Sequence, residues 1–179
     1  MSADAARIRG IHHQRSALRF GSPEGAPLAV PPVYLHPGHV VVSDGAGALA
    51  TILGSCVAVC LHDPALGMGG MNHYLLPTVG SQAEQPGRYG PSAIDRLVES
   101  MLTRGASRER LVAYVVGGAS VLAAYSDAQH LGQRNAAVAQ QVLALHRIPI
   151  VGSDVGGIRG RKLLFMPSNG QVVVQFIGA

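Results

Sequence analysis

The stretch from Leu49 to Leu61 constrains the fold of this chain more than any other segment. It is apolar and rich in residues that favour β-strands, and only Gly54 and Ser55 interrupt it. A glycine inside a strand pattern indicates a bulge or the close approach of another backbone. We therefore expect two strand-like segments around a local irregularity that falls immediately before Cys56.

Further strands and two helices are expected along the rest of the chain. Apolar residues recur at helical spacing in residues 92–104 and 132–146. The near-continuous apolar run at 111–116 indicates a strand that is buried on both faces. Other β-like runs lie at 33–35, 40–42, 71–76, 148–151, 163–166 and 171–177, the last two flanking a hairpin turn at 167–170. This order predicts a single α/β domain with mixed strand pairing rather than a regular β-α-β alternation.

The composition is that of a globular protein of one domain. The chain has 179 residues, of which 47% are hydrophobic and 13% charged. Residues 1–29 are polar and basic without clear periodicity, so we expect a flexible N-terminal tail before a domain at 30–179. Basic residues are scattered despite a net charge of +4, which argues against a nucleic-acid partner.

The cytoplasm is the expected compartment. The first 20 residues lack the apolar region of a secretory signal. No apolar stretch reaches the roughly 18 residues that membrane insertion requires. Two cysteines in a cytoplasmic chain also argue against a disulfide scaffold.

Cys56 is the first residue that could carry chemistry. Amides of a bulge at Gly54 and Ser55 could point at a developing oxyanion, which suits a nucleophilic thiolate. The alternative is a buried and inert thiol, as most free cysteines are. Cys60 follows four residues later, too far along an extended strand for a disulfide or a shared metal, and is expected to be a packing residue.

His73 is the second such residue. It lies in an apolar segment behind the paired glycines Gly69 and Gly70. If the two segments are neighbours, its imidazole could take the thiol proton of Cys56 and later protonate a leaving amine. A histidine that only packs in the core is the alternative.

Two glycine-containing segments have less specific interpretations. Residues 154–162 are glycine-rich and basic, which fits either an exposed turn or an anion-binding loop, but not a P-loop. Residues 132–135 are typical of a turn that leads into a helix, with Asn135 as a candidate cap.

Taken together, the motifs of this chain resemble the chemoreceptor glutamine deamidase family, CheD. The resemblance covers about residue 33 to residue 175. It is carried, in this order, by Tyr34-Leu35-His36-Pro37-Gly38, Leu53-Gly54-Ser55-Cys56-Val57-Ala58-Val59-Cys60-Leu61, Gly69-Gly70-Met71-Asn72-His73, Arg88-Tyr89-Gly90, Gly117-Gly118-Ala119, Gly132-Gln133-Arg134-Asn135, Asp154-Val155-Gly156-Gly157 and Gly160-Arg161-Lys162.

The resemblance implies an α/β sandwich like the deamidase domain of the cytotoxic necrotizing factors. It also implies a cytoplasmic protein-glutamine glutaminase of bacterial chemotaxis, which converts glutamines of methyl-accepting chemoreceptors to glutamate and releases ammonia. No metal or organic cofactor is needed, and the phosphatase CheC is an implied partner of some members.

The resemblance also assigns site residues. The family's nucleophile matches Cys56 and its base matches His73. Its third catalytic residue is a threonine six positions before the cysteine, where this chain has Ala50, with Thr51 one residue later. A one-residue shift turns a strand side chain to the other face, so Thr51 can serve only if the strand is irregular.

Three other functions remain open from the sequence. The same thiol chemistry could hydrolyse receptor glutamyl methyl esters. The chain could also be an inactive module that binds a receptor or phosphatase, which Ala50 would allow. The basic charge alone leaves room for a nucleic-acid binder, which would show strongly salt-dependent binding.

Overall fold

The computed structural model describes residues 11–13, 28–45, 47–78, 85–120 and 126–177. Within these residues the strands form two five-stranded sheets. The first has the order β3-β6-β5-β7-β8, with β3 at Val40–Ser43, β6 at Met68–Asn72, β5 at Val57–Asp63, β7 at Val112–Gly117 and β8 at Ile150–Val155. The second has the order β1-β10-β9-β4-β2, with β1 at Ile11–His13, β10 at Gln171–Ile177, β9 at Gly160–Met166, β4 at Leu49–Leu53 and β2 at Val33–Tyr34.

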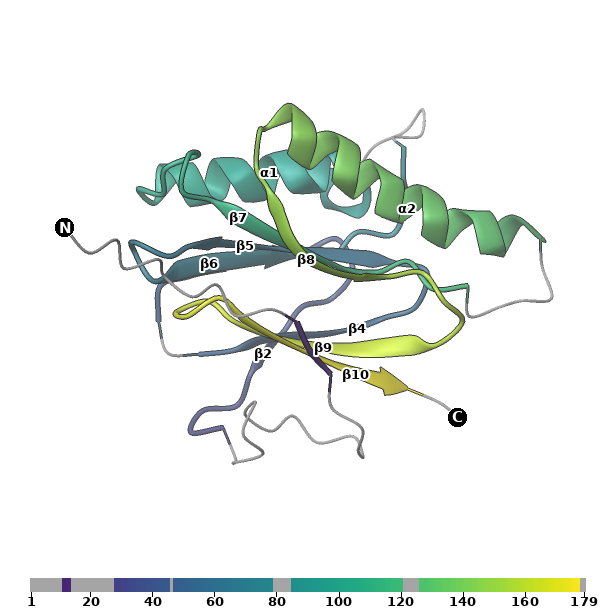
Figure 1. Cartoon of the computed structure of the whole chain (residues 1–179), viewed down its shortest axis with the longest axis horizontal. Coiled ribbons are helices and arrows are strands. Elements are labelled where there is room, and N and C mark those ends of the chain that lie inside the picture. Colours follow the sequence, from purple (N-terminus) through teal and green to yellow (C-terminus); the bar gives the residue numbers. More distant parts are fainter. Residues whose placement is uncertain (1–10, 14–27, 46, 79–84, 121–125, 178–179) are drawn as a thin grey trace.

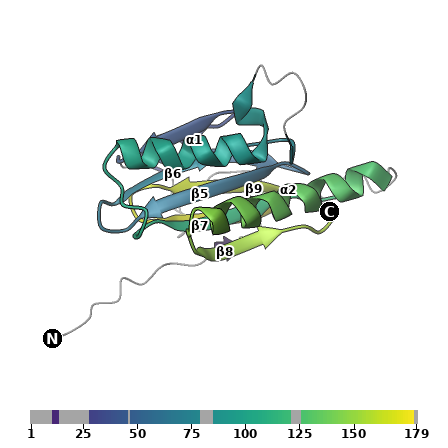
Figure 2. The same cartoon turned by 90° about the horizontal axis from the view of Figure 1, so that it is seen from above.

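The elements stack in three layers. Helices α1 (Gly90–Thr103) and α2 (Ser126–Leu145) cover one face of the first sheet, and the second sheet lies against its other face (Figure 1). Seen from above, the two helices lie beside each other across that sheet (Figure 2). Strands β5 and β7 pair antiparallel, whereas β7 and β8 pair parallel. The predicted α/β class, the mixed sheets and the two main helices are therefore confirmed; the likeness to the cytotoxic necrotizing factors stays a prediction.

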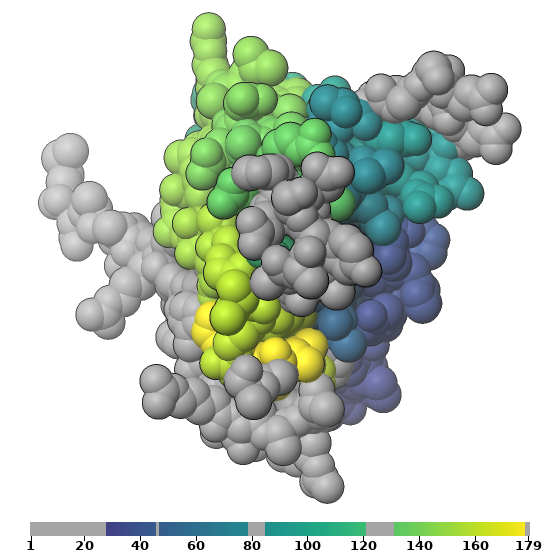
Figure 3. Space-filling view, turned by 90° about the vertical axis from the view of Figure 1, so that its right-hand side faces the viewer, coloured from purple at the N-terminus to yellow at the C-terminus, as the bar shows by residue number. Residues whose placement is uncertain are grey.

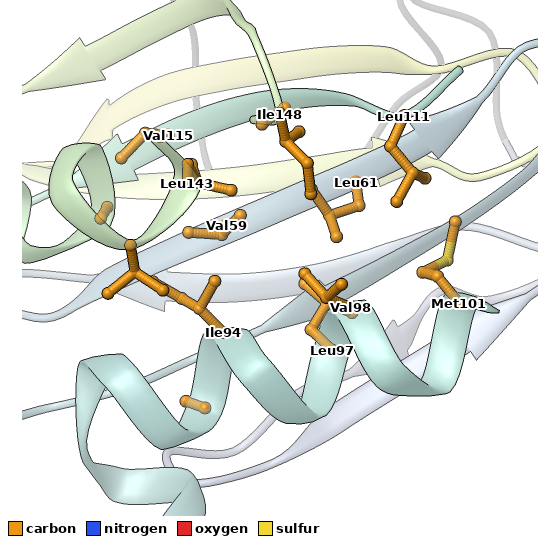
Figure 4. Close-up of a cluster of buried hydrophobic side chains, with 14 of the residues drawn as sticks. Val59, Leu61, Ile94, Leu97, Val98, Met101, Leu111, Val115, Leu143 and Ile148 are labelled. Atoms are coloured by element: carbon orange, nitrogen blue, oxygen red, sulfur yellow. The ribbon is translucent and has the colours of Figure 1, made fainter. Parts of the chain in front are cut away.

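Strand β5 supplies side chains to both hydrophobic layers because successive strand residues point to opposite faces. Val57, Val59 and Leu61 face the helices, where they join a buried cluster with side chains of α1 and α2 (Figure 4). Ala58 and Cys60 point the other way, into the cluster between the two sheets. This burial on both faces explains why residues 57–61 are all apolar.

Strand β6 begins and ends earlier than the predicted strand at 71–76. The paired glycines lie inside β6 rather than before it. A Cβ on Gly69 would come within 2.8 Å of the Phe165 ring, and one on Gly70 within 2.8 Å of a Leu97 methyl group. The glycines are therefore required by close packing of neighbouring layers, which a strand pattern alone does not reveal.

Helix α2 also begins earlier than predicted, at Ser126 rather than near 132. The segment that suggested a turn lies inside the helix, so the expectation that Asn135 caps it is wrong. Gly132 is needed there because a Cβ would lie 2.4 Å from the carbonyl oxygen of Gly118. A glycine that resembles a helix breaker is thus a contact point between α2 and the end of β7.

The glycine-rich segment at 154–162 is mostly strand, with a turn at 156–159 between β8 and β9. Gly156 and Gly157 adopt the positive φ angles of +78° and +71° that the turn requires. The Arg161 guanidinium lies 2.7 Å from the Asp154 carboxylate, and both side chains are nearly buried. Because this arginine already has an anionic partner within the chain, the turn interpretation is the one that the structure supports.

The N-terminal region contains one element that the sequence pattern did not predict. Residues 11–13 pair in parallel with Val172–Val174 of β10. The other residues of the expected tail up to 27 lie outside the described ranges, so its flexibility stays a prediction. In the space-filling view, the blue-purple surface, which the bar assigns to residues 28–45, lies below the teal surface of α1 (Figure 3). No helix among the described residues has the length and apolar character to cross a membrane.

Candidate active site

Thr51 and His73 are in direct contact. The Thr51 hydroxyl oxygen lies 2.9 Å from His73 Nδ1 and 2.8 Å from the Leu35 carbonyl oxygen. Because the carbonyl can only accept, the hydroxyl donates to Leu35 and accepts from Nδ1–H of His73. These partners assign the proton of the neutral imidazole to Nδ1 and leave Nε2 with a free lone pair.

The register of β4 directs Thr51 toward His73. Leu49 and Leu53 lie in the cluster between the sheets, and Thr51 shares their face because strand side chains alternate. Ala50 points to the opposite side, into a separate cluster on the outer face of the second sheet. The residue that meets the histidine in this chain is therefore Thr51, although the family pattern led to Ala50.

Cys56 and His73 lie on the same face of neighbouring chain segments. Val57 and Tyr74 exchange both backbone hydrogen bonds as an antiparallel pair, which puts Cys56 opposite Leu75 and His73 opposite Ala58. His73 and Cys56 are thus diagonal neighbours, a relation that places Cα atoms about 7–8 Å apart and long side chains within reach. Cys56 also packs against the cluster between the sheets, where Ala58 lies.

The imidazole of His73 is neutral and has one ring nitrogen without a partner among the described residues. The side chain is buried, and Nε2 has no hydrogen-bond partner among the described residues. Burial lowers its pKa to about 4, an effect that the exposed His36 and His39 reinforce by their charge. At neutral pH the ring is therefore uncharged.

The thiol of Cys56 is uncharged at rest as well. Burial raises its pKa above the ordinary value, and the residue's own backbone N–H opposes that rise. A standing thiolate–imidazolium pair is thus not favoured.

Backbone contacts hold the loop before Cys56. The Cys56 carbonyl accepts a hydrogen bond of 2.8 Å from Gly118 N–H, and the Gly54 carbonyl accepts one of 2.8 Å from Ala119 N–H. A Cβ on Gly117 would lie 2.2 Å from the Cys56 carbonyl oxygen. The segment Gly117-Gly118-Ala119 therefore fixes the backbone of the candidate nucleophile.

Two asparagines near the site were not recognised as such from the sequence. Asn72 is the residue just before His73, and its Oδ1 accepts a hydrogen bond of 2.8 Å from Val59 N–H. Asn135 reaches from α2 and donates to the carbonyls of Ser55 and Leu75. Both contacts join residues far apart in the chain. Only the Asn72-His73 adjacency could have pointed to the first of them.

Cys60 does not take part in this arrangement. It is fully buried, and burial raises its pKa far above the ordinary value of a thiol. This agrees with the predicted packing role.

The fold and the site define an α/β sandwich with a half-buried thiol and a threonine-oriented imidazole on one face of a sheet. Such a set of groups is suited to acyl transfer through a cysteine nucleophile.

Comparison with known proteins identifies the family. Residues 75–176 match the family model described as CheD chemotactic sensory transduction. A relative from Anaeromyxobacter dehalogenans, named as a probable chemoreceptor glutamine deamidase, CheD 1, is 49% identical over 170 residues, which cover 94% of this chain and 98% of the relative. This chain belongs to the CheD family.

Two further relatives carry the same description. The chain is 49% identical over 143 residues to a probable chemoreceptor glutamine deamidase CheD of Xanthomonas campestris pv. campestris, covering 79% of this chain and 71% of the relative. It is 47% identical over 141 residues to that of Stenotrophomonas maltophilia, with the same coverage.

Proposed function

We propose that this chain is a protein-glutamine deamidase that converts glutamine side chains of methyl-accepting chemoreceptors to glutamate. Cys56 is the nucleophile, His73 the general base and acid, and Thr51 the residue that orients the imidazole. The cytoplasmic location belongs to the same proposal. Its main support is the Thr51–His73 hydrogen bond, which leaves Nε2 unpaired on the face that carries Cys56.

The first half of the reaction forms a thioester. Nε2 of His73 takes the thiol proton as the Cys56 sulfur bonds to the amide carbon and the carbonyl electrons move onto oxygen. Backbone N–H groups stabilise the resulting oxyanion, by about 3–4 kcal/mol for one well-placed donor. As the oxyanion collapses, Nε2–H gives its proton to the amide nitrogen, the C–N bond breaks and ammonia leaves.

The second half hydrolyses the thioester. Nε2 takes a proton from water while the water oxygen bonds to the thioester carbon. Collapse of this second oxyanion breaks the C–S bond, and the sulfur recovers its proton from His73. The products are glutamate and the free thiol, so the site needs no other reactant than water. Throughout, Thr51 keeps Nδ1 protonated and Nε2 available.

Mass spectrometry of a purified receptor cytoplasmic fragment tests the activity. The wild-type chain should add about 1 Da at individual glutamines, because an amide NH₂ is replaced by OH, and should release one ammonia for each change. Cys56→Ala should do neither, while Cys60→Ala, a control with the other cysteine removed, should behave as the wild type. Ammonia release by Cys56→Ala would refute the assignment of the nucleophile.

The same experiment separates the alternatives. Methanol release from a methylated receptor fragment would reveal methyl-ester hydrolysis, whose acyl carbon is attacked in the same way. Receptor binding without ammonia or methanol would indicate an inactive interaction module. The phosphatase CheC as partner is also part of this proposal, on family membership alone, and a binding measurement with purified CheC tests it.

A further inference from the structure

Asn135 connects helix α2 to the two chain segments that carry the candidate site. Its side chain is fully buried. Nδ2 lies 2.9 Å from the Ser55 carbonyl oxygen and 2.8 Å from the Leu75 carbonyl oxygen. Two carbonyl acceptors require two N–H donors, and a primary amide is the neutral side chain that provides both from one nitrogen.

This amide lies where two paired segments diverge. Val57 and Tyr74 still exchange both backbone hydrogen bonds. The next hydrogen-bonded pair of a regular antiparallel ladder would be Ser55 and Leu76, but Leu76 N–H donates to the Arg88 carbonyl and the Leu76 carbonyl accepts from Gly90 N–H. The Ser55 carbonyl is thereby left without a partner on the opposite segment, and Asn135 binds it together with the Leu75 carbonyl.

The contact fixes the direction of the Cys56 N–H. In a trans peptide the C=O of one residue and the N–H of the next point in opposite directions. Because the Ser55 carbonyl points toward Asn135 on α2, the Cys56 N–H points away from that helix. Only Cα and Cβ separate the backbone nitrogen of a cysteine from its sulfur, so this N–H lies near the thiol, and it opposes the rise in the thiol pKa that burial causes.

Among the described residues, Asn135 is the one whose side chain hydrogen-bonds a backbone group of residues 54–56. The carbonyls on either side, those of Gly54 and Cys56, are held by the backbone N–H groups of Ala119 and Gly118. Among the described residues, no backbone carbonyl or side-chain oxygen accepts a hydrogen bond from the Cys56 N–H. That N–H is therefore available to a ligand beside the sulfur.

We propose that Asn135 is a positioning residue, which holds the Ser55–Cys56 peptide so that the Cys56 N–H can donate to the oxyanion formed when Cys56 attacks a carbonyl. The inference rests on the proposed thiol chemistry. Without Asn135 the Ser55 carbonyl has no partner, and rotation of that peptide would turn a carbonyl oxygen toward the developing negative charge. Asn135 itself does not touch the reacting atoms.

The other end of the amide argues against a purely structural role. Asn135 Oδ1 is buried and has no hydrogen-bond partner among the described residues. A buried acceptor without a partner lowers stability. An asparagine at this position therefore lowers the stability of the fold through its unpaired oxygen, and its hydrogen bond to the Ser55 carbonyl is a reason for its presence.

Two reactions of the same thiol separate the positioning role from simple destabilisation. Alkylation of Cys56 by iodoacetamide displaces iodide at a saturated carbon and forms no oxyanion. Acylation by p-nitrophenyl acetate proceeds through a tetrahedral oxyanion and releases p-nitrophenolate. Both rates are measured in a Cys60→Ala background, for the parent, for Asn135→Leu, and for Leu143→Ala as a control at a buried position of the same helix.

Asn135→Leu should slow acylation and ammonia release about 100-fold, the usual effect of losing one oxyanion donor. Alkylation forms no oxyanion, so its rate at a pH where the thiol is fully ionised should stay within about threefold of the parent. The midpoint of its pH dependence should move upward, because the Cys56 N–H that lowers the thiol pKa would no longer be held beside the sulfur. Leu143→Ala should lower the urea midpoint of unfolding without changing the ratio of acylation to alkylation. If Asn135→Leu does not fold, Asn135→Ala, which removes both donors without adding volume or charge, takes its place.

Equal losses in both reactions, or none in acylation, would overturn the inference. A parent chain that is alkylated but never acylated at Cys56 would overturn it as well. A parent that is acylated but releases no ammonia from receptor glutamine refutes the proposed deamidation instead. In that case the acylation-to-alkylation ratio of Asn135→Leu still decides the role of Asn135.

Discussion

Replacing Thr51 by valine tests how the histidine is held. Valine has nearly the shape of threonine but no hydroxyl, so it removes the 2.8 Å and 2.9 Å contacts to Leu35 and His73 without opening a cavity. The Nδ1–H and the Leu35 carbonyl then lose the hydroxyl that both of them contact, and only their interaction with each other remains. Each unsatisfied group costs about 1–3 kcal/mol, partly offset by the loss of a buried hydroxyl, so we expect unfolding to become easier by about 1–3 kcal/mol.

Activity should fall for a separate reason. The Thr51 contact favours the imidazole with its proton on Nδ1, and a neutral buried hydrogen bond is worth about 1–1.5 kcal/mol. A difference of that size changes the population of the productive tautomer, and hence kcat/KM, by about 5- to 10-fold. Ammonia release from a receptor fragment measures kcat/KM, and urea unfolding measures stability in the same samples.

Two controls make the result specific. Thr51→Ser retains the hydroxyl and should keep most of the activity. Adding Ala50→Ser to Thr51→Val should not restore it, because residue 50 faces the outer cluster with Leu164 and Val173. A Thr51→Val chain with full kcat/KM, or rescue by Ala50→Ser, would refute the reasoning about which strand face holds the histidine.

Three further outcomes are expected. The acid limb of kcat/KM should lie near pH 4 rather than near the ordinary histidine value of 6.5. His73 must be neutral to accept the thiol proton, and it is protonated only below its pKa of about 4. A pH–rate profile with its acid limb near 6.5 would contradict this prediction. Cys60→Ala should lower stability by about 1 kcal/mol through a small cavity but leave kcat within about twofold, as thermal unfolding and ammonia release can check. Gly117→Ala should abolish most activity, because the new Cβ would lie 2.2 Å from the Cys56 carbonyl oxygen at a φ of +119°; an active variant with wild-type thiol alkylation would contradict the described loop geometry.

Much of the local structure could be predicted because it depends on short-range patterns. The apolar run at 111–116 became the buried strand β7, and the helical spacing at 92–104 became α1. The predicted boundaries of β6 and α2 were wrong because their glycines lie at close contacts between layers, Gly69 against Phe165 and Gly132 against Gly118. A glycine has the same local signature in a turn and at a close contact, so the sequence alone could not distinguish the two.

The sequence by itself determined the α/β class, the candidates Cys56 and His73, and the resemblance to the CheD family. Only the tertiary structure decided that Thr51, and not the residue at position 50, meets His73. It also decided that Asn135 lies beside Ser55, which is 80 positions away in the chain. The physical reason is that strand register and the approach of α2 are set by packing of whole layers, and a shift of one residue reverses the face on which a strand side chain lies.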